Sequence, residues 1–159
     1  MPEHAERPSR PDLPSRDPAE TVIDPGTEKG ARVDARLREE LVAWLVTVAV
    51  DGTPVPTPVW FWWDGETILI YSQRDKPKVR HIATNPRVAL AMRTDDQGDA
   101  LVVITGDAAV DGSAPRADEL SEYIEKYRAA IGRLGSDPVQ FAGEYSVPIR
   151  IRPTKLRAW

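Results

Sequence analysis

The sequence predicts a mainly β, α+β fold in which an antiparallel barrel of about six strands, closed or partly closed, carries helices at its periphery. Short apolar segments rich in β-branched residues are separated by tight-turn dipeptides, which is typical of strands joined by hairpins. One short helical pattern interrupts these strands, and a longer one follows most of them. Closure of the sheet would protect the many short strand edges of such a chain.

Residues 1–30 are predicted to form a flexible N-terminal arm, and residues 31–159 a single domain. The arm contains six prolines and charges of both signs without apolar periodicity, so it has little apolar surface to offset the entropy of ordering it. The pair Val22-Ile23 is a small apolar anchor. It leaves open the alternative that part of the arm lies along a partner subunit.

The elements of the domain follow from periodicity and turn chemistry. Val33, Leu37 and Leu41 recur every four residues and predict the first helix. The pairs Asp51-Gly52 and Asp64-Gly65 supply the positive φ of two hairpin turns. In chain order we expect helices over 31–40, 76–84 and 117–134 and a short one through 142, with strands over 44–50, 55–63, 67–72, 88–92, 101–110 and 147–159.

The sequence also predicts how some of these elements pack in the sheet and against one another. Prolines in the strand over 55–63 cannot donate ladder hydrogen bonds, so this strand should lie at an edge or be irregular. The strand over 67–72 is apolar on both faces and should be central. Gly106 marks a bulge or a close approach of two backbones. In the long helix, Glu122 and Lys126 are spaced for an i,i+4 ion pair. The apolar stripe of that helix consists of Leu120, Tyr123, Ile124, Tyr127 and Ile131.

Composition excludes several kinds of site and partner. The chain has no cysteine, which excludes disulfides, thiolate metal sites and cysteine nucleophiles. Its two histidines, His4 and His81, are too few for an ordinary zinc site, so no metal is expected. A net charge of -4 argues against a general nucleic-acid binder. No apolar run is long enough to span a bilayer and the start does not resemble a signal peptide, so a cytoplasmic protein is expected.

A basic segment between Gln73 and Arg93 is the main candidate for a ligand site. It begins where a strand is predicted to feed a short helix, so free backbone N–H groups and the helix dipole would add to the positive charge. This favours an anionic ligand over the alternative, a solvated helix face. The cations are Arg74, Lys76, Lys78, Arg80, Arg87 and Arg93, and the single acid among them is Asp75.

Several runs together resemble one family of flavin proteins. They are WLVTVAVDGTPVPTPVWFWWDGETILIYS, then KPKVRHIATNPRVAL, then VVITGDAAV. These runs are similar to the pyridoxamine 5'-phosphate oxidase-like split barrels, and most similar to the actinobacterial branch that uses the deazaflavin F420. The resemblance extends from about residue 30 to 159 and includes the runs GARVDARLREELVAWL and YSVPIRIRPTKLRAW. It implies a six-stranded FMN-binding split barrel and a homodimer with two cofactor sites at the subunit interface.

The resemblance also implies roles for particular residues. Tyr71, Ser72 and the loop after them match the part of the motif that holds the cofactor phosphate, and Lys78 and Arg80 match a K-x-R pair that opens the helix. His81 stands where many members have asparagine. The long helix over 117–134 would cover part of the groove. The predicted cofactor-binding residues are Pro58, Val59, Trp60, Tyr71, Ser72, Gln73, Lys76, Lys78 and Arg80; no catalytic residue and no metal ligand is assigned.

Several side chains have structural alternatives. Alternation places Trp60 and Trp62 on one face of their strand and Phe61 and Trp63 on the other, so one face is core and the other is available to a cofactor or a partner. The Tyr71 phenol either contacts the cofactor, donates a proton to substrate, or is a strand residue with a satisfied hydroxyl. A capping or surface role is expected for His81.

The function that follows is an F420-dependent oxidoreductase. It would transfer a hydride between reduced F420 and a small electron-poor acceptor with a C=C, C=N or quinone-like group. Two alternatives stay open: an FMN-dependent oxidase or reductase of the pyridoxamine-phosphate-oxidase type, and a protein that binds F420, a flavin or a tetrapyrrole without turnover.

Overall fold

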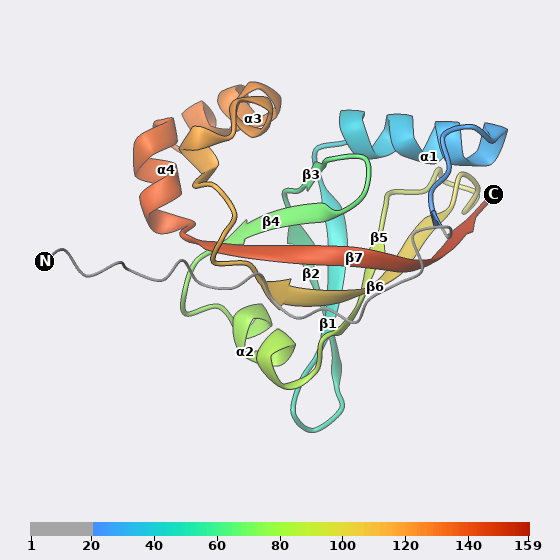
Figure 1. Ribbon diagram of the computed structural model, residues 1–159, viewed down its shortest axis with the longest axis horizontal. Helices are drawn as coiled ribbons and strands as arrows, with labels where there is room; N and C mark the ends of the chain where they lie inside the picture. Colours follow the sequence, from blue (N-terminus) through green and yellow to red (C-terminus); the bar gives the residue numbers. More distant parts are fainter. Residues whose placement is uncertain (1–20) are drawn as a thin grey trace, which may run out of the picture.

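One antiparallel sheet of seven strands forms the body of the protein in the computed structural model, which describes residues 21–159. Figure 1 shows the sheet curled into a half-barrel, with α1, α3 and α4 on one side and α2 on the other. The strands are β1 (Ala43–Val48), β2 (Pro54–Val59), β3 (Trp62–Trp63), β4 (Ile68–Ser72), β5 (Arg87–Ala91), β6 (Val102–Val110) and β7 (Val147–Ala158). The helices are α1 (Glu28–Glu39), α2 (Pro77–Thr84), α3 (Ser121–Arg133) and α4 (Pro138–Glu144), with a 3₁₀ turn over Ala117–Glu119.

The predicted split barrel is confirmed, but with seven strands where six were expected. The strand predicted over 55–63 breaks at Trp60 and Phe61, so that its first part, β2, pairs with β1 and its last part, β3, pairs with β4. The sheet order is β2-β1-β5-β6-β7-β4-β3, which places these two pieces at opposite edges. Only two residues join the edges, and three extended steps reach about 10 Å. The sheet must therefore curl until its edges almost meet.

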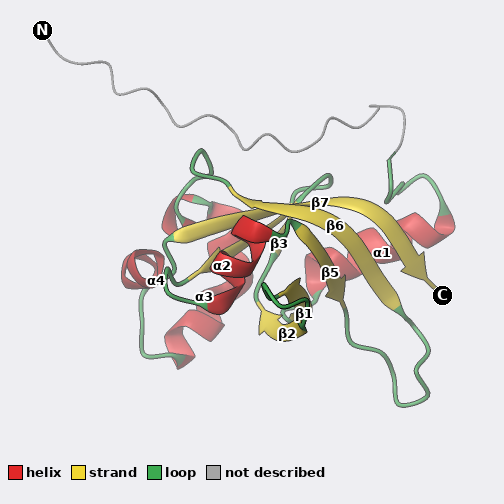
Figure 2. Cartoon of the chain, turned by 90° about the horizontal axis from the view of Figure 1, so that it is seen from below, coloured by secondary structure: helices red, strands yellow, loops and turns green. Residues whose placement is uncertain are grey.

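Two apolar clusters stabilise the fold. The first lies inside the curl and includes Leu45, Leu90, Ile104 and Ile149, all of them buried. The second lies on the other face of β4, where α3 and α4 pack against Leu69 and Tyr71. Figure 2 shows α2, α3 and α4 gathered at one end of the sheet, away from α1. The two faces of β4 thus belong to two separate cores, and all five of its residues are buried as predicted.

The first helix begins earlier than predicted. α1 starts at Glu28 because Thr27 caps it, its hydroxyl accepting a hydrogen bond from the Gly30 N–H at 3.0 Å. Leu41 lies beyond the helix end and is 43% exposed, so the predicted apolar stripe is only partly correct. Ile23, placed in the arm by sequence, packs in the barrel core of its own chain. Residues 1–20 of the predicted arm lie outside the described residues.

The predicted turns and irregularities are largely confirmed. Gly52 and Gly65 have φ of 87° and 93° in the two hairpins, and the proline-rich β2 is an edge strand. Gly106 lies opposite Pro153, where the register between β6 and β7 shifts by one residue. A Cβ at Gly106 would lie 2.5 Å from the Arg152 carbonyl oxygen, so this is the predicted close approach.

The long helix predicted over 117–134 is interrupted. Leu120 has an extended backbone, φ -95° and ψ 94°, and separates the 3₁₀ turn from α3. The Glu119 carboxylate accepts from the Arg116 N–H at 3.3 Å, so the short turn is capped as a unit of its own. The predicted stripe is otherwise confirmed, because Tyr123, Ile124, Tyr127 and Ile131 are all buried.

The ion pair predicted between Glu122 and Lys126 is wrong. The Lys126 ammonium donates instead to the carbonyl oxygens of Leu37 at 3.2 Å and Phe61 at 3.0 Å. It also lies 4.0 Å from the centre of the Phe61 ring, a cation–π contact. Leu37 is in the last turn of α1, where carbonyl groups lack helical partners. Burial, opposed by the nearby charge of Glu40, lowers the pKa of Lys126 to about 8.

No helix within residues 21–159 is both long enough and apolar enough to cross a membrane.

Replacing Gly106 with alanine tests the close approach of β6 and β7. We expect Gly106→Ala to lower the free energy of unfolding by about 1–3 kcal/mol, because its methyl group would displace backbone. Gly132→Ala in α3 is the matched control: its methyl group meets nothing within 4 Å, and it should raise stability by about 1 kcal/mol. Urea unfolding measures both. Equal behaviour of the two variants would contradict the account.

The depressed pKa of Lys126 predicts a pH dependence of stability. Between about pH 8 and 10.5 the unfolded chain holds this proton more often than the native state, so the free energy of unfolding gains a term that rises with pH. Lys126→Met should remove that term, whereas Lys29→Met, at an exposed position on α1, should keep it. Urea unfolding from pH 7 to 10.5 compares the slopes. A wild-type slope in Lys126→Met would show that Lys126 is not buried as described.

Candidate functional site

A pocket of about 230 Å³ opens beside the break between β2 and β3. The end of β2, the break after it and β4 supply one wall. The helices α2, α3 and α4 supply the rest. The lining residues are Pro58, Val59, Trp60, Tyr71, Lys78, Tyr123, Leu134, Phe141 and Tyr145.

The structure brings together five of the nine residues predicted to bind a cofactor. These are Pro58, Val59, Trp60, Tyr71 and Lys78, drawn from three separate parts of the chain. They meet because β2 and β4 lie near the split of the barrel and α2 follows β4 directly.

The other four predicted residues lie around the pocket rather than in its lining. Ser72 is buried, and its hydroxyl donates to the carbonyl oxygen of Gln73 at 2.8 Å. Gln73 lines a second, more open hollow together with Arg74 and Glu144. Lys76 is the exposed N-cap residue of α2. Arg80 is exposed and donates to the Asp75 carbonyl oxygen at 3.1 Å. For these residues a ligand role stays a prediction.

Four pocket residues were not predicted: Tyr123, Leu134, Phe141 and Tyr145. The long helix over 117–134 was expected to cover part of the groove, and α3 and the residue Leu134 that follows it do line the pocket. The aromatic residues of α3 were identified only as an apolar stripe. Phe141 and Tyr145 are four residues apart on and just after α4, and this spacing was the one available signal that they share a face.

Aromatic stacking gives the pocket a rigid wall. The Trp60 ring lies 4.9 Å from that of Tyr127 at an interplanar angle of 7°, and 5.6 Å from that of Phe141 at 20°. Phe141 stacks in turn on Tyr145 at 4.4 Å. The predicted alternation holds, since Phe61 and Trp63 are buried in the barrel core while Trp60 and Trp62 pack on the helix side.

The orientation of Trp60 is set by hydrogen bonds to its neighbour. The Phe61 N–H donates to the Tyr127 hydroxyl at 2.8 Å, and this hydroxyl lies 2.8 Å from the Leu41 carbonyl oxygen and 2.9 Å from that of Phe61. Lys126 donates to the same Phe61 carbonyl. Both backbone groups of Phe61 are therefore held by α3, and the chain cannot twist Trp60 out of the wall without breaking them.

Lys78 is the cation of the pocket. It is half-buried and forms no ion pair or hydrogen bond within the described chain. Burial, with the nearby charge of Lys76, lowers the pKa of Lys78. No described group of opposite charge offsets this destabilisation of the charged form. An anion bound beside it would supply that partner. The remaining cations of the basic segment are exposed. For them the structure agrees with the alternative prediction, a charged surface that faces solvent.

Tyr71 is committed to a structural contact. Its hydroxyl donates to the carbonyl oxygen of Pro115 at 2.7 Å, and burial raises the pKa of its phenol. Of the interpretations given from sequence, the satisfied strand hydroxyl is therefore the one observed. The contact ties β4 to the loop that leads into α3.

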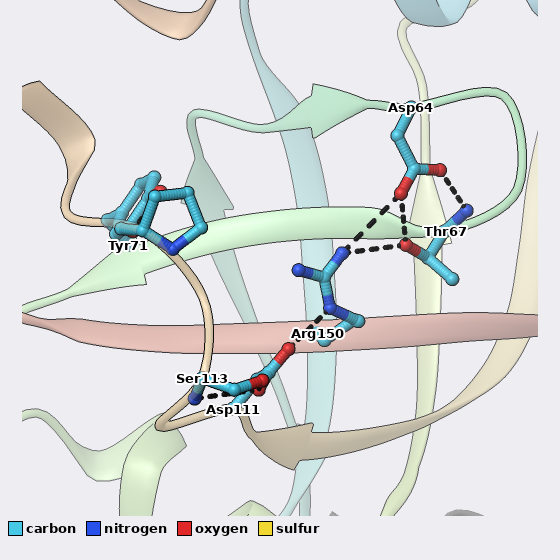
Figure 3. Close-up of polar contacts among 7 residues, drawn as sticks. Asp64, Thr67, Tyr71, Asp111, Ser113 and Arg150 are labelled. Atoms are coloured by element: carbon cyan, nitrogen blue, oxygen red, sulfur yellow. Dashed lines mark hydrogen bonds and ion pairs between the residues drawn. The ribbon is translucent and has the colours of Figure 1, made fainter. Parts of the chain in front are cut away.

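The same loop is anchored by a buried ion pair, shown in Figure 3. Arg150 on β7 donates to Asp111 at 2.7 Å and to the Thr67 hydroxyl at 2.9 Å. Burial alone would raise the pKa of Asp111, but hydrogen bonds from Ser113 and Arg150 outweigh it and hold that pKa below its usual range. The loop from β6 to α3 is thus fixed at both Asp111 and Pro115, which positions the helix that lines the pocket.

His81 lies outside the pocket lining. Its Nδ1 is 2.8 Å from the Thr47 hydroxyl oxygen, a partly buried contact between α2 and β1. His81 was expected to have a capping or surface role, but its side chain instead connects α2 to β1.

The chain is similar to a known protein family and to several solved structures. Residues 30–159 match the family described as pyridoxamine 5'-phosphate oxidase. No curated protein matches the chain significantly. Among solved structures, an F420 reductase is 27% identical with a TM-score of 0.61, over 78% of this chain and 94% of its own.

Two further solved structures share the fold. A conserved hypothetical protein from Mycobacterium tuberculosis has a TM-score of 0.67 at 22% identity, over 87% of this chain and 86% of its own. The heme storage protein HutZ from Vibrio cholerae has a TM-score of 0.54 at 18% identity, over 80% of this chain and 92% of its own. Because the family match covers most of the sequence, the chain belongs to the pyridoxamine 5'-phosphate oxidase family.

Proposed function

We propose that the protein is an F420-dependent oxidoreductase that reduces a small electron-poor acceptor carrying a C=C, C=N or quinone-like group. The observation that carries the proposal is the pairing, in one pocket, of an uncompensated cation with a flat aromatic wall. A deazaflavin has both complementary parts, a phosphodiester handle and a planar ring. The likeness to an F420 reductase supports the choice of F420 over FMN.

The residues present fit such a cofactor. Lys78 would hold the anionic handle, and the exposed Lys76 and Arg80 at the start of α2 would add charge for its acidic tail. Trp60, which is partly exposed and lines the pocket, offers the ring an apolar surface. When bound, F420 supplies the hydride, and the protein contributes position, an apolar wall and exclusion of water. The Tyr71 hydroxyl is already occupied by Pro115, so it is not assigned as a proton donor.

We further propose that a second copy of the chain completes the site. Trp44 is 49% exposed and lies beside Pro58 on β2 and Ala91 on β5, forming an apolar face on the outside of the sheet. Pro58 belongs both to this face and to the pocket lining. A single chain encloses about 230 Å³, less than the roughly 300–1,000 Å³ of typical ligand pockets. A partner on this face would cover the apolar surface and add a wall.

Cofactor titration tests the function. Addition of F420 should quench intrinsic tryptophan fluorescence saturably, since Trp60 lies in the pocket wall, and FMN should bind much more weakly. Preferential binding of FMN would favour the FMN-dependent alternative. Multiple turnovers of reduced F420 with enone or quinone acceptors separate an enzyme from a storage protein, which would bind without turnover.

Charge reversal tests the role of Lys78. Lys78→Glu should weaken F420 binding by about 10- to 100-fold, the loss of one charge-assisted contact. Arg87→Glu, at an exposed position of the same basic segment outside the pocket lining, should change the affinity little. An unchanged affinity in Lys78→Glu, or equal losses in both variants, would remove Lys78 from the site.

Sedimentation tests the second copy. The wild-type protein should sediment as a dimer, and Trp44→Glu should shift it towards monomer by placing a charge in the apolar face. Val139→Glu on α4 is the control, because Val139 is 65% exposed and lies on another element. A monomeric wild type, or a dimer indifferent to Trp44→Glu, would reject this interface.

A further inference from the structure

Three buried tyrosines surround the pocket, and their hydroxyl groups differ in one respect. The Tyr71 hydroxyl donates to the Pro115 carbonyl oxygen, and the Tyr127 hydroxyl is bonded to the backbone of Leu41 and Phe61. Tyr123 is only 1% exposed, yet its hydroxyl has no hydrogen bond to any described residue. A buried hydroxyl without a partner is costly, so its presence needs an explanation.

We infer from two observations that the Tyr123 hydroxyl is open to the pocket. Within residues 21–159, the only fully enclosed side-chain polar atom that lacks a partner is Nη2 of Arg152. The Tyr123 hydroxyl is therefore not sealed inside the protein, and Tyr123 lines the pocket. Its partner must come from whatever fills that space, which is water in the free protein and a ligand when one is bound.

Packing holds the Tyr123 ring in place. The Tyr123 ring lies edge-on to Tyr71 at 5.0 Å and 77°, and 4.8 Å from Tyr127. Phe141 covers it at 6.2 Å. Burial, with the neighbouring tyrosines, raises the pKa of Tyr123, so the phenol stays neutral and keeps its proton. It is an oriented donor at the edge of a stack of aromatic rings.

We propose that the Tyr123 hydroxyl determines specificity by donating a hydrogen bond to a carbonyl oxygen on a flat conjugated ring bound in the pocket. The aromatic wall at Trp60 and Phe141 would bind the face of such a ring, and Tyr123 would select its edge. Two sources share this chemistry: a ring carbonyl of the cofactor, and the carbonyl of a quinone- or enone-type acceptor. The inference rests on the proposed function for the identity of the first source only.

Matched ligands isolate this hydrogen bond. The probes are menadione, a flat ring with two carbonyl oxygens, and 2-methylnaphthalene, a similar ring with none. The full chain has no cysteine, so menadione has no thiol to alkylate. The proteins are the wild type, Tyr123→Phe, which keeps its ring and loses only the hydroxyl, and the control Thr84→Val, which loses an exposed hydroxyl outside the pocket lining. Equilibrium dialysis gives the affinities for both probes and for F420.

We expect Tyr123→Phe to lose about fivefold in menadione affinity, the effect of one neutral hydrogen bond, and to keep its affinity for 2-methylnaphthalene. Thr84→Val should keep the preference for menadione, because Thr84 lies outside the pocket lining. A loss for F420 in Tyr123→Phe assigns the bond to the cofactor ring, and a loss for menadione assigns it to the acceptor.

The proposal is overturned if Tyr123→Phe binds both F420 and menadione as the wild type does, or if the wild type binds neither. If the wild type binds menadione but not F420, the proposed function fails while the menadione comparison still tests Tyr123. The two hypotheses therefore fail separately.

Discussion

The structure depends on how the chain crosses the split in its barrel. Trp60 and Phe61 join two strands at opposite edges of the sheet, and a two-residue bridge has no regular hydrogen-bonding partner of its own. The Tyr127 hydroxyl and the Lys126 ammonium of α3 satisfy both backbone groups of Phe61. This contact fastens α3 to the sheet, closes the second apolar cluster, and holds the Trp60 ring as a wall. Without it the bridge and the Trp60 ring would have no fixed orientation, and the pocket beside them would have no fixed shape.

The chemistry of the pocket follows from that placement. β4 faces the barrel core on one side and the helical cluster on the other, so the two cores share it. Its end leads directly into α2, which carries the pocket cation. The loop fastened by Asp111 and Arg150 leads into α3, whose Tyr127 stacks on Trp60 and so supports the aromatic wall. The cation and the aromatic side chains, which are far apart in the sequence, therefore line the same pocket. A flat molecule with an anionic end suits this arrangement better than a uniformly charged or uniformly apolar one.

Local patterns were enough to predict most of the fold. Constraints that act over a few residues were readable in the turn glycines, the prolines of the edge strand and the doubly apolar β4. The cluster of cations at the start of α2 predicted that a ligand would bind near this helix. What could not be predicted depends on contacts between distant segments. Lys126 meets carbonyl groups 89 and 65 residues away, so local spacing suggested the wrong partner, Glu122. Likewise, a helical stripe shows that Tyr123 and Tyr127 are buried, but not that one hydroxyl is bonded and the other is open to a cavity.

The proposed function requires that a flat ligand bind against Trp60 at the split of the barrel. The indole N–H signals of the five tryptophans, assigned by single Trp→Phe variants, would report this directly in ¹⁵N-labelled protein. On addition of F420 the account predicts a large shift of the Trp60 signal and little change for Trp159, which lies at the far end of β7. An unmoved Trp60 signal at saturating F420, or a shift confined to Trp159, would contradict it.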